Sequence, residues 1–434
     1  MLTGTPEALI SIAEIKVFLL YSTMCISLKE GEGILDERNH TIRNKRDEGL
    51  VEYANRVAEK ISLTAAKFDE SGEFPFEHFD ILRKEGYLKL TIPKEYGGEE
   101  LSLYEILLVQ ERLAKANGST ALAVGWHLMT FFSISNFRPW KEQIFSQICK
   151  EAVEEGSLLN VYATERAAGN ILRGINPATI ARKTENGYII TGRKAFATLA
   201  PIVKHFTVLA YIEEEDKTAE FLIEKSGNVK VIDTWKVMGM RGTGSHDIEL
   251  NDVLVPNEAL LAYSEKGVPN RFNANSSAYT LQLPAIYLGI AIAARDFIIP
   301  YADEKYSDSL GDFIIEAPHV QQKIGEIEIL ISVSRSLLYS LAEKWDNNLH
   351  VRDKLTNEVA ITKYTICNNA KKIVELTMEI AGGHSLSQDL PLERYFRDVQ
   401  CGLFNPPLND MVVKQASTTA IENYRHHKQI LQIK

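Results

Sequence analysis

The sequence predicts an α+β protein in which an antiparallel β segment lies between two helical segments. The central stretch, 161–223, contains short runs rich in β-branched and aromatic residues, separated by turn signals. Helical periodicity dominates on both sides, from 47 to about 157 and from about 274 onward. Asn186-Gly187 is typical of a two-residue hairpin turn, because a type I′ turn requires positive φ at both central positions.

The middle β domain is predicted over residues 158–260. A strand beginning near Asp247 alternates polar and apolar residues, as a half-buried strand does, and Pro256 ends it. Earlier strands are expected at Ala178–Thr184, Tyr188–Phe196, Phe206–Ile212 and Ala219–Ile223.

The segment before the sheet, residues 47–157, is predicted to be an N-terminal helical domain. Within 101–113, apolar residues recur on one face of an amphipathic helix. Trp126-His127 lies in a run of small and apolar residues. This pair is interpreted as part of a packed helix with a core histidine, and the alternative is the wall of a pocket.

The segment after the sheet, residues 261–434, is predicted to be a C-terminal helical bundle. Apolar residues from Val320 to Leu341 keep a sustained helical spacing. A second long helix is expected from Lys354 to Ala381, where Gly382-Gly383 ends it. Long antiparallel helices of this kind suit a four-helix bundle.

Composition excludes several classes of protein. The chain has 434 residues, of which 45% are hydrophobic and 24% charged, as in an ordinary soluble globular protein. A net charge of −10 argues against nucleic acid as a partner. The four cysteines show neither CxxC spacing nor a disulfide framework, which favours a reducing, cytoplasmic location. No cluster of metal ligands is visible in the sequence, and no metal is expected.

Residues 1–46 are predicted to form an N-terminal extension. The uncharged part of its apolar run, Val17–Leu28, is shorter than the roughly 20 residues that a bilayer span requires. It also lacks the basic region and the cleavage site of a signal peptide. The extension is interpreted as poorly ordered or as an upstream start-site artefact, with a short docked helix as the alternative; no membrane partner is expected.

Several short segments carry a resemblance to a known family. In order, they are Thr164-Glu-Arg-Ala-Ala-Gly-Asn170, Gly192-Arg-Lys-Ala-Phe-Ala-Thr198, Met238-Gly-Met-Arg-Gly-Thr243 with Asp252–Pro256, and Leu390–Asp398. At this spacing they resemble the acyl-CoA dehydrogenase family of flavoproteins. The resemblance implies helical, β and four-helix domains, bound FAD, and α,β-dehydrogenation of an acyl-CoA thioester. It further implies a homotetramer, a role in fatty acid metabolism, and an electron acceptor or oxygen as partner.

The resemblance also implies site residues. Thr164 and Thr198 have hydroxyls that can donate to or accept from the edge of a flavin ring, and Phe196 stands where the family commonly has tryptophan. Gly382 and Gly383 resemble a glycine pair of the family that meets the FAD of a neighbouring subunit, and glycine permits a close backbone approach to a phosphate or ribityl group. The expected cofactor contacts are Tyr162, Thr164, Asn170, Phe196, Thr198, Gly382 and Gly383, and the expected substrate contacts are Asn170 and Arg241.

Three positions depart from the family. Ser307 stands where the family has the arginine that pairs with the FAD pyrophosphate, and Glu379 stands where it often has glutamine. Pro406 falls at the position of the catalytic glutamate, and proline has neither a carboxylate nor an N–H. The catalytic base is therefore unknown, and Asp410 is the residual candidate.

Two alternatives follow from the missing base. The same fold houses flavin monooxygenases, which need no such base, and Asn405-Pro406 is similar to a turn in their corresponding loop. Tyr279, Ser276 and Ser277 are then candidate hydrogen-bond partners for activated oxygen, with core or surface roles as the alternative. The other alternative is a base-less protein that binds FAD or acyl-CoA without turnover.

Overall fold

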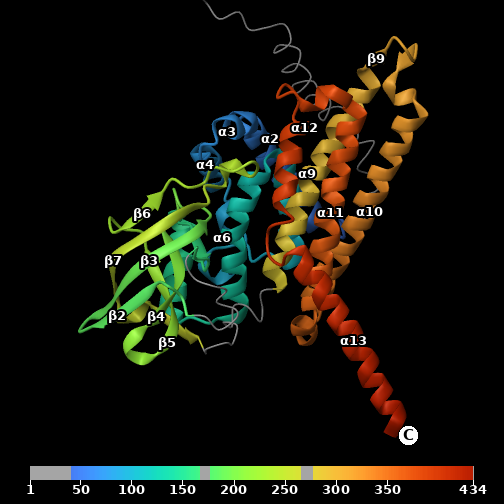
Figure 1. Cartoon of the computed structure of the whole chain (residues 1–434). Coiled ribbons are helices and arrows are strands. Elements are labelled where there is room, and N and C mark those ends of the chain that lie inside the picture. The colour runs from blue at the N-terminus through green and yellow to red at the C-terminus, as the bar shows by residue number, and fades with distance from the viewer. Residues whose placement is uncertain (1–40, 167–175, 265–276, 434) are drawn as a thin grey trace, which may run out of the picture. The chain divides into compact units, whose positions relative to one another are not determined.

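The computed structural model describes residues 41–166, 176–264 and 277–433 (Figure 1). Residue contacts divide the chain into two units, 1–45 and 46–434, and the fold below is that of the second unit. Most of the predicted N-terminal extension lies outside the described residues.

Helices fill the region before the sheet. Helix α5 is capped by a reciprocal pair in which Ser102 accepts from the Glu105 N–H and Glu105 accepts from the Ser102 N–H, which satisfies two exposed donors. Helix α6 is apolar all round and packs on both β1 and α9. The helices are α2 (Lys45–Ser62), α3 (Ala65–Ser71), α4 (Phe76–Lys84), α5 (Leu103–Ala116), α6 (Gly118–Phe137) and α7 (Glu142–Glu154).

The sheet has the strand order β6-β7-β3-β2-β4-β5-β8, and β1 pairs with β4. The strands are β1 (Leu159–Tyr162), β2 (Ile180–Thr184), β3 (Gly187–Ala197), β4 (His205–Ile212), β5 (Lys217–Glu224), β6 (Val229–Ile232), β7 (His246–Pro256) and β8 (Leu260–Ser264). The predicted strands are thus confirmed. The sheet is mixed rather than wholly antiparallel, because β1 and β2 both run parallel to β4. The connection 163–179 is long enough to return the chain to the same end of the sheet.

The hairpin between β2 and β3 differs from the prediction. Thr184 pairs with Gly187, so the two loop residues are Glu185 and Asn186, and neither has positive φ. Gly187 is instead the first residue of β3. A Cβ at Gly187 would lie 2.0 Å from the Val255 carbonyl oxygen of β7, so the close approach of the two strands requires glycine there.

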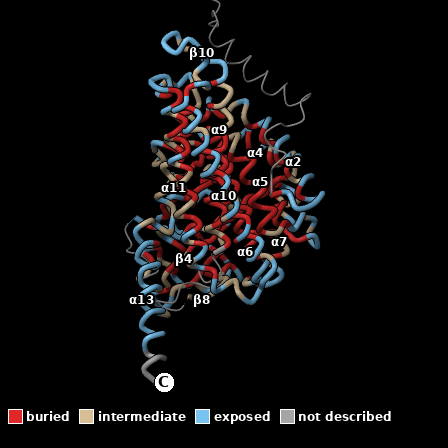
Figure 2. The backbone as a smooth tube through the Cα atoms, turned by 90° about the vertical axis from the view of Figure 1, so that its right-hand side faces the viewer, coloured by how far each residue is buried: buried red, intermediate tan, exposed pale blue. Residues whose placement is uncertain are grey.

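The C-terminal bundle is built from α9 (Ser277–Glu304), α10 (Pro318–Asn347), α11 (Thr356–Ala381) and α13 (Asn409–Ile433), with the shorter α12 (Leu392–Cys401) against α9 and α11. A small hairpin, β9 (Tyr306–Ser307) with β10 (Asp312–Phe313), joins α9 to α10. In α9, Ala278–Glu304 is long and apolar enough to cross a membrane, but 78% of its most apolar window is buried in the fold. Helix α9 is therefore the central core helix, whereas α13 is largely exposed (Figure 2).

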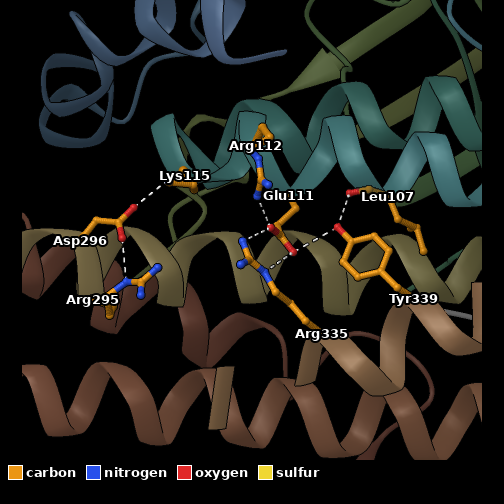
Figure 3. Close-up of polar contacts among 8 residues, drawn as sticks. All are labelled: Leu107, Glu111, Arg112, Lys115, Arg295, Asp296, Arg335 and Tyr339. Atoms are coloured by element: carbon orange, nitrogen blue, oxygen red, sulfur yellow. Dashed lines mark hydrogen bonds and ion pairs between the residues drawn. The ribbon is translucent and has the colours of Figure 1, made fainter. Parts of the chain in front are cut away.

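A buried ionic network joins α5 to α10 (Figure 3). Glu111 of α5 is inaccessible to solvent and accepts from Arg335 Nη2 of α10 at 2.7 Å, from Tyr339 at 3.1 Å and from Arg112. Burial raises the pKa of Glu111, but the two guanidinium groups more than offset it, so the pKa ends below its ordinary value. The ionised carboxylate therefore holds α5 and α10 in register across the apolar core.

Candidate functional site

Strand β1 carries the first predicted site residues, and His127 of α6 fixes where β1 starts. The Leu159 N–H donates to His127 Nδ1 at 3.0 Å, so Nε2 carries the hydrogen that is donated to the Leu88 carbonyl oxygen at 2.8 Å. Burial lowers the pKa of His127 to about 4. His127 is thus a neutral core histidine, as predicted.

An ion pair joins the first two family-like segments. Lys194 of β3 pairs with Glu165 and also donates to the Leu209 carbonyl oxygen of β4 at 2.7 Å. Glu165 further accepts from the Ala178 N–H at 2.6 Å and from the Thr179 hydroxyl at 2.6 Å. The pair sets the position of Thr164 relative to the end of β3.

Thr198 is held through its backbone carbonyl as well as its side chain. Its carbonyl oxygen accepts from Asn160 Nδ2 at 2.8 Å and from the Tyr162 hydroxyl at 2.9 Å. Tyr162 is buried, and its ring packs 5.0 Å from that of Phe206. Tyr162 therefore lies behind the surface that Thr198 lines, where it orients Thr198 rather than presenting its own ring.

Phe196 lies at the surface of the sheet in a strained conformation. Its φ is +54°, which is uncommon for a bulky residue, and the residue is 54% exposed. The Arg166 guanidinium lies 5.4 Å from the centre of the ring and binds Asp247 at 2.9 Å. Strain of this kind costs about 1–3 kcal/mol and concentrates at functional sites. Thr164 is exposed near this surface, and no described residue hydrogen-bonds to its hydroxyl.

The third family-like segment packs on α12. A Cβ at Gly239 would lie 2.3 Å from the Arg397 carbonyl oxygen, and the Met240 N–H donates to Asp398 at 2.5 Å. Burial raises the pKa of Asp398 to about 6. Arg241 points away from this contact, and its guanidinium donates to the Glu70 carbonyl oxygen at 3.3 Å.

The remaining predicted cofactor residues lie elsewhere. Gly382, with φ +63°, and Gly383 follow α11, are exposed, and have open space where a Cβ would stand. Within one chain the described residues place them at the end of α11, away from the sheet that carries Phe196. Asn170 lies outside the described residues.

Hydrogen bonds to α9 and α11 hold the loop that replaces the catalytic segment. Asn405 donates to the Tyr287 hydroxyl of α9 at 2.7 Å, and Lys363 of α11 donates to the Pro407 carbonyl oxygen at 3.0 Å. Pro406 supplies no ionisable group to the site. Asp410 lies in the first turn of α13 and is exposed.

Sequence reasoning missed several residues that the fold brings to the site. Asn160, Thr243 and Ser245 surround Thr198, and the Arg166 guanidinium lies over one face of the Phe196 ring. Arg166 and Thr243 lie within family-like segments of the sequence, but nothing in a linear pattern reveals that Thr243, Ser245 and Asn160 are neighbours of Thr198. Tyr279 of α9 lies against the Trp126 ring at 5.4 Å and shares a hydrogen bond with Thr130, while Ser276 lies outside the described residues.

The fold and this site define a three-domain oxidoreductase of a flavoprotein family. Three family models match in order: acyl-CoA dehydrogenase, N-terminal domain, over residues 47–137; middle domain, over 160–253; and C-terminal domain, over 281–404. The chain therefore belongs to the acyl-CoA dehydrogenase family.

Two relatives with full-length similarity belong to the same family. YdbM of Bacillus subtilis (strain 168), provisionally named an acyl-CoA dehydrogenase, is 38% identical over 88% of this chain and 99% of its own length. Cyclohexane-1-carbonyl-CoA dehydrogenase of Syntrophus aciditrophicus (strain SB) is 30% identical over 79% of this chain and 88% of its own length.

Solved structures show the same fold at lower identity. Butyryl-CoA dehydrogenase from Megasphaera elsdenii aligns with a TM-score of 0.77 and 21% identity, over 88% of this chain and 99% of that chain. FMN-bound TdsC from Paenibacillus sp. A11-2 aligns with a TM-score of 0.78 and 21% identity, over 86% and 98%. KijD3 in complex with FMN and a dTDP-linked amino sugar aligns with a TM-score of 0.78 and 23% identity, over 88% and 95%.

The described residues fit a flavin ring better than they fit a diphosphate. Phe196 offers an exposed face, and Thr164 and Thr198 offer hydroxyls beside it. Around the β9–β10 hairpin, by contrast, residues 303–316 carry five carboxylates and one lysine. At the expected pyrophosphate position, Ser307 shares its hydroxyl with Ser309 at 3.1 Å and supplies no charge.

Proposed function

We propose that this chain is a flavin-dependent oxidoreductase that removes the α and β hydrogens of an acyl-CoA thioester. The observation that carries the proposal is the joint position of Thr164, Phe196 and Thr198. They come from two segments of the sequence, and buried contacts hold them near the C-terminal end of β3. The two acyl-CoA dehydrogenase relatives at 30% identity or more support an acyl-CoA substrate.

Each of these residues has a separate task in the proposal. Phe196 presents a flat apolar face that excludes water from one side of the ring, and Arg166 limits its movement. Thr164 and Thr198 bind polar edges of the ring. When bound, FAD accepts the β-hydrogen together with its electron pair. We further propose that Gly382 and Gly383 admit close backbone contact with the cofactor of a neighbouring subunit, and that Asn170 and Arg241 contact the substrate.

The α-proton has to pass to a base outside the loop at 401–410. Pro406 has no carboxyl group, and Asn405 donates a hydrogen bond to Tyr287. Asp410 is exposed to solvent on α13. A non-proline residue at 406 could donate its backbone N–H to the thioester oxygen and so polarise it. Proline lacks this donor.

The proposal is tested by mixing the flavin-loaded protein anaerobically with a panel of acyl-CoA thioesters of different chain length. Loss of the oxidised-flavin absorption band with at least one thioester, together with formation of the enoyl-CoA, is the expected result. A flavin band that survives every thioester would overturn the proposed reaction.

A second function is favoured by one observation, which is the absence of a carboxylate from the rebuilt loop 401–408. Oxygen activation on a reduced flavin requires no α-proton base. If thioesters fail and the reduced protein consumes oxygen while it hydroxylates a small molecule, the chain is a monooxygenase. If both reactions fail and tight flavin binding remains, it is a binding protein without turnover.

We propose a cytoplasmic homotetramer with a role in fatty acid metabolism, organised as domains 47–157, 158–260 and 261–434. Apolar side chains that α13 exposes to solvent support the assembly, because subunit contacts would cover them. They are Met411, Val413, Ile421 and Tyr424. The free thiols of Cys149, Cys367 and Cys401 support a reducing location. Light scattering after gel filtration measures the subunit number, and a monomer would contradict the assembly.

A further inference from the structure

Two arginine side chains share one buried carboxylate where β3 pairs with β7. Asp247 of β7 accepts from Arg166 Nε at 2.9 Å and Nη2 at 3.1 Å, and from Arg193 Nε of β3 at 3.0 Å. The Asp247 side chain is 0% exposed, whereas those of Arg166 and Arg193 are 55% and 47% exposed. The buried carboxylate therefore anchors two guanidinium groups that remain about half exposed.

This cluster of Arg166, Arg193 and Asp247 is cationic. Burial raises the pKa of Asp247, but hydrogen bonds from both guanidinium groups and from the Thr234 hydroxyl more than offset it, so the pKa ends below its ordinary value. The ionised carboxylate balances only one of the two guanidinium groups, which stay charged at any ordinary pH. The cluster thus carries a positive charge in a chain whose net charge is −10.

Each guanidinium group also has N–H donors to spare. An arginine side chain carries donors on Nε, Nη1 and Nη2. Asp247 binds Nε and Nη2 of both arginines, and no acceptor for either Nη1 is found in the part of the chain that the structure describes. Two planar forks on one anchor can donate together to a single anion, and their geometry suits the oxygens of a phosphate.

The cluster lies beside the surface that Phe196 presents. The Arg166 guanidinium is 5.4 Å from the centre of the Phe196 ring. Arg193 and Phe196 are both exposed on β3, with two buried residues between them. The β9–β10 hairpin, by contrast, has Ser307 in place of a family arginine and five carboxylates around it. The positive charge that a phosphate requires is therefore found at 166 and 193 and not at 307.

We propose that Arg166 and Arg193 form a subsite for a phosphate ester of a bound ligand, next to the exposed face of Phe196. The inference rests on the proposed flavin-dependent function and adds the place where the phosphate of a ligand is held. Two ligands of that function carry such an ester: a flavin nucleotide on its ribityl chain, and coenzyme A in its nucleotide half. Either phosphate accepts charge-assisted hydrogen bonds from the two guanidinium groups.

The test compares ligands that differ only in the phosphate. FMN and riboflavin share the ring and the ribityl chain, and only FMN carries the phosphate. Arg193→Gln leaves Asp247 paired with Arg166, and Arg193 takes no part in the ring contacts of Phe196. We expect this variant to raise the Kd for FMN about tenfold and the Kd for riboflavin less than about twofold, since one charge-assisted contact is lost. Fluorescence quenching on titration of the flavin-free protein measures both constants.

Further variants separate the subsite from general effects of charge. Arg166→Gln should weaken FMN binding by a similar factor, and Arg166→Lys should recover part of the loss because it keeps the charge. Lys230→Gln is the matched control. Lys230 of β6 is exposed and stands opposite Glu249 from one side, as Arg193 does from the other, but it does not bind Asp247. It should leave both constants unchanged. Unfolding midpoints check that each variant is folded.

A second pair of ligands tells which phosphate occupies the subsite. Non-reactive thioether analogues of an acyl-CoA and of the matching acyl-pantetheine share the acyl end, and only the first carries phosphates. Isothermal titration of the flavin-loaded protein measures their Kd values. If Arg193→Gln weakens the CoA analogue alone and leaves the ratio of FMN to riboflavin affinity unchanged, the subsite holds the phosphate of coenzyme A. The reverse result assigns it to the flavin nucleotide.

Two results would overturn the subsite. One is an Arg193→Gln variant in which neither affinity ratio changes, FMN to riboflavin or CoA analogue to pantetheine analogue. The other is an equal change in Lys230→Gln. None of these measurements requires turnover. The expected ratios in a protein whose flavin no thioester reduces would reject the proposed reaction and leave the subsite, whereas normal reduction with unchanged ratios would reject the subsite alone.

Discussion

The Lys194 ammonium and the Glu165 carboxylate form an ion pair in which the two side chains are 0% and 1% exposed. Burial raises the pKa of Glu165, but Lys194 and three hydrogen bonds more than offset it and leave the pKa below its ordinary value. The Glu165 carboxylate is therefore ionised beside the Lys194 ammonium, whose own pKa is lowered by burial in spite of the nearby carboxylate. Each depends on the other, because an isolated buried charge is far more costly than the pair.

Lys194→Met should destabilise the flavin-free protein by about 3–5 kcal/mol, since it leaves the Glu165 carboxylate buried without its counter-ion. Urea denaturation measures this difference. Replacing both residues, Lys194→Met with Glu165→Gln, should recover a large part of the loss, because no buried charge is left and the amide still accepts from Ala178 or Thr179. Equal losses in the single and double variants would show that the pairing has no energetic role.

The imidazole of His127 should make stability depend on pH. Its pKa is about 4 in the fold and ordinarily about 6.5, so the folded state binds fewer protons than the unfolded state between these values. The contribution is fully present above pH 6.5 and is lost as the pH falls toward 4. The shift corresponds to about 3 kcal/mol.

His127→Gln should remove this part of the acid sensitivity, and urea denaturation from pH 7 to pH 4 measures it. His78, whose pKa burial also lowers to about 4, remains in the variant and keeps its own contribution. A variant whose stability falls with pH as steeply as that of the wild type would show that His127 does not titrate as the burial predicts.

The loop that replaces the catalytic segment gives a prediction in two parts. Asp410→Asn should leave the rate of flavin reduction by an acyl-CoA unchanged, because Asp410 faces solvent from the first turn of α13. Pro406→Glu should raise that rate at least tenfold, since a positioned general base contributes about 10²–10⁴-fold. Anaerobic stopped-flow absorbance measures both.

Pro406→Gln is the matched control for the second part, because it restores the backbone N–H and the side-chain length without a carboxylate. The rate of flavin reduction should rise in Pro406→Glu and stay unchanged in Pro406→Gln. A loss of more than tenfold in Asp410→Asn would identify Asp410 as the base and would require the loop to rearrange when substrate binds.

The acidic hairpin at β9–β10 predicts weak recognition of the adenylate half of FAD. Ser307→Arg should lower the Kd for FAD about threefold to tenfold and leave the Kd for FMN unchanged, because only FAD carries the second phosphate that an arginine can pair with. Flavin fluorescence quenching on titration of the flavin-free protein measures both constants. Ser309→Arg adds the same charge two residues away, and an equal effect there would mean that net charge, not position, is responsible.

Sequence reasoning succeeded where local pattern and short motifs carry the information. The strand positions, the long helices at 318–347 and 356–381, and the order of the three domains follow from periodicity and turn residues. It failed at the β2–β3 turn, because what decides the place of Gly187 is the distance to Val255 on β7, a strand far along the chain. It also missed the parallel pairing of β1 with β4, which depends on where a long connection returns.

By itself, the sequence determined the family, the loss of the acid at position 406, and the residue types that can face a flavin, since these are properties of amino acids and their order. Only the tertiary structure decided that Tyr162 orients Thr198 from behind and that Thr198, Ser245 and Thr243 share hydrogen bonds. The physical reason is that a hydroxyl group both donates and accepts. Which of these it does depends on the partners that folding brings within 3 Å, and those partners are distant in the chain.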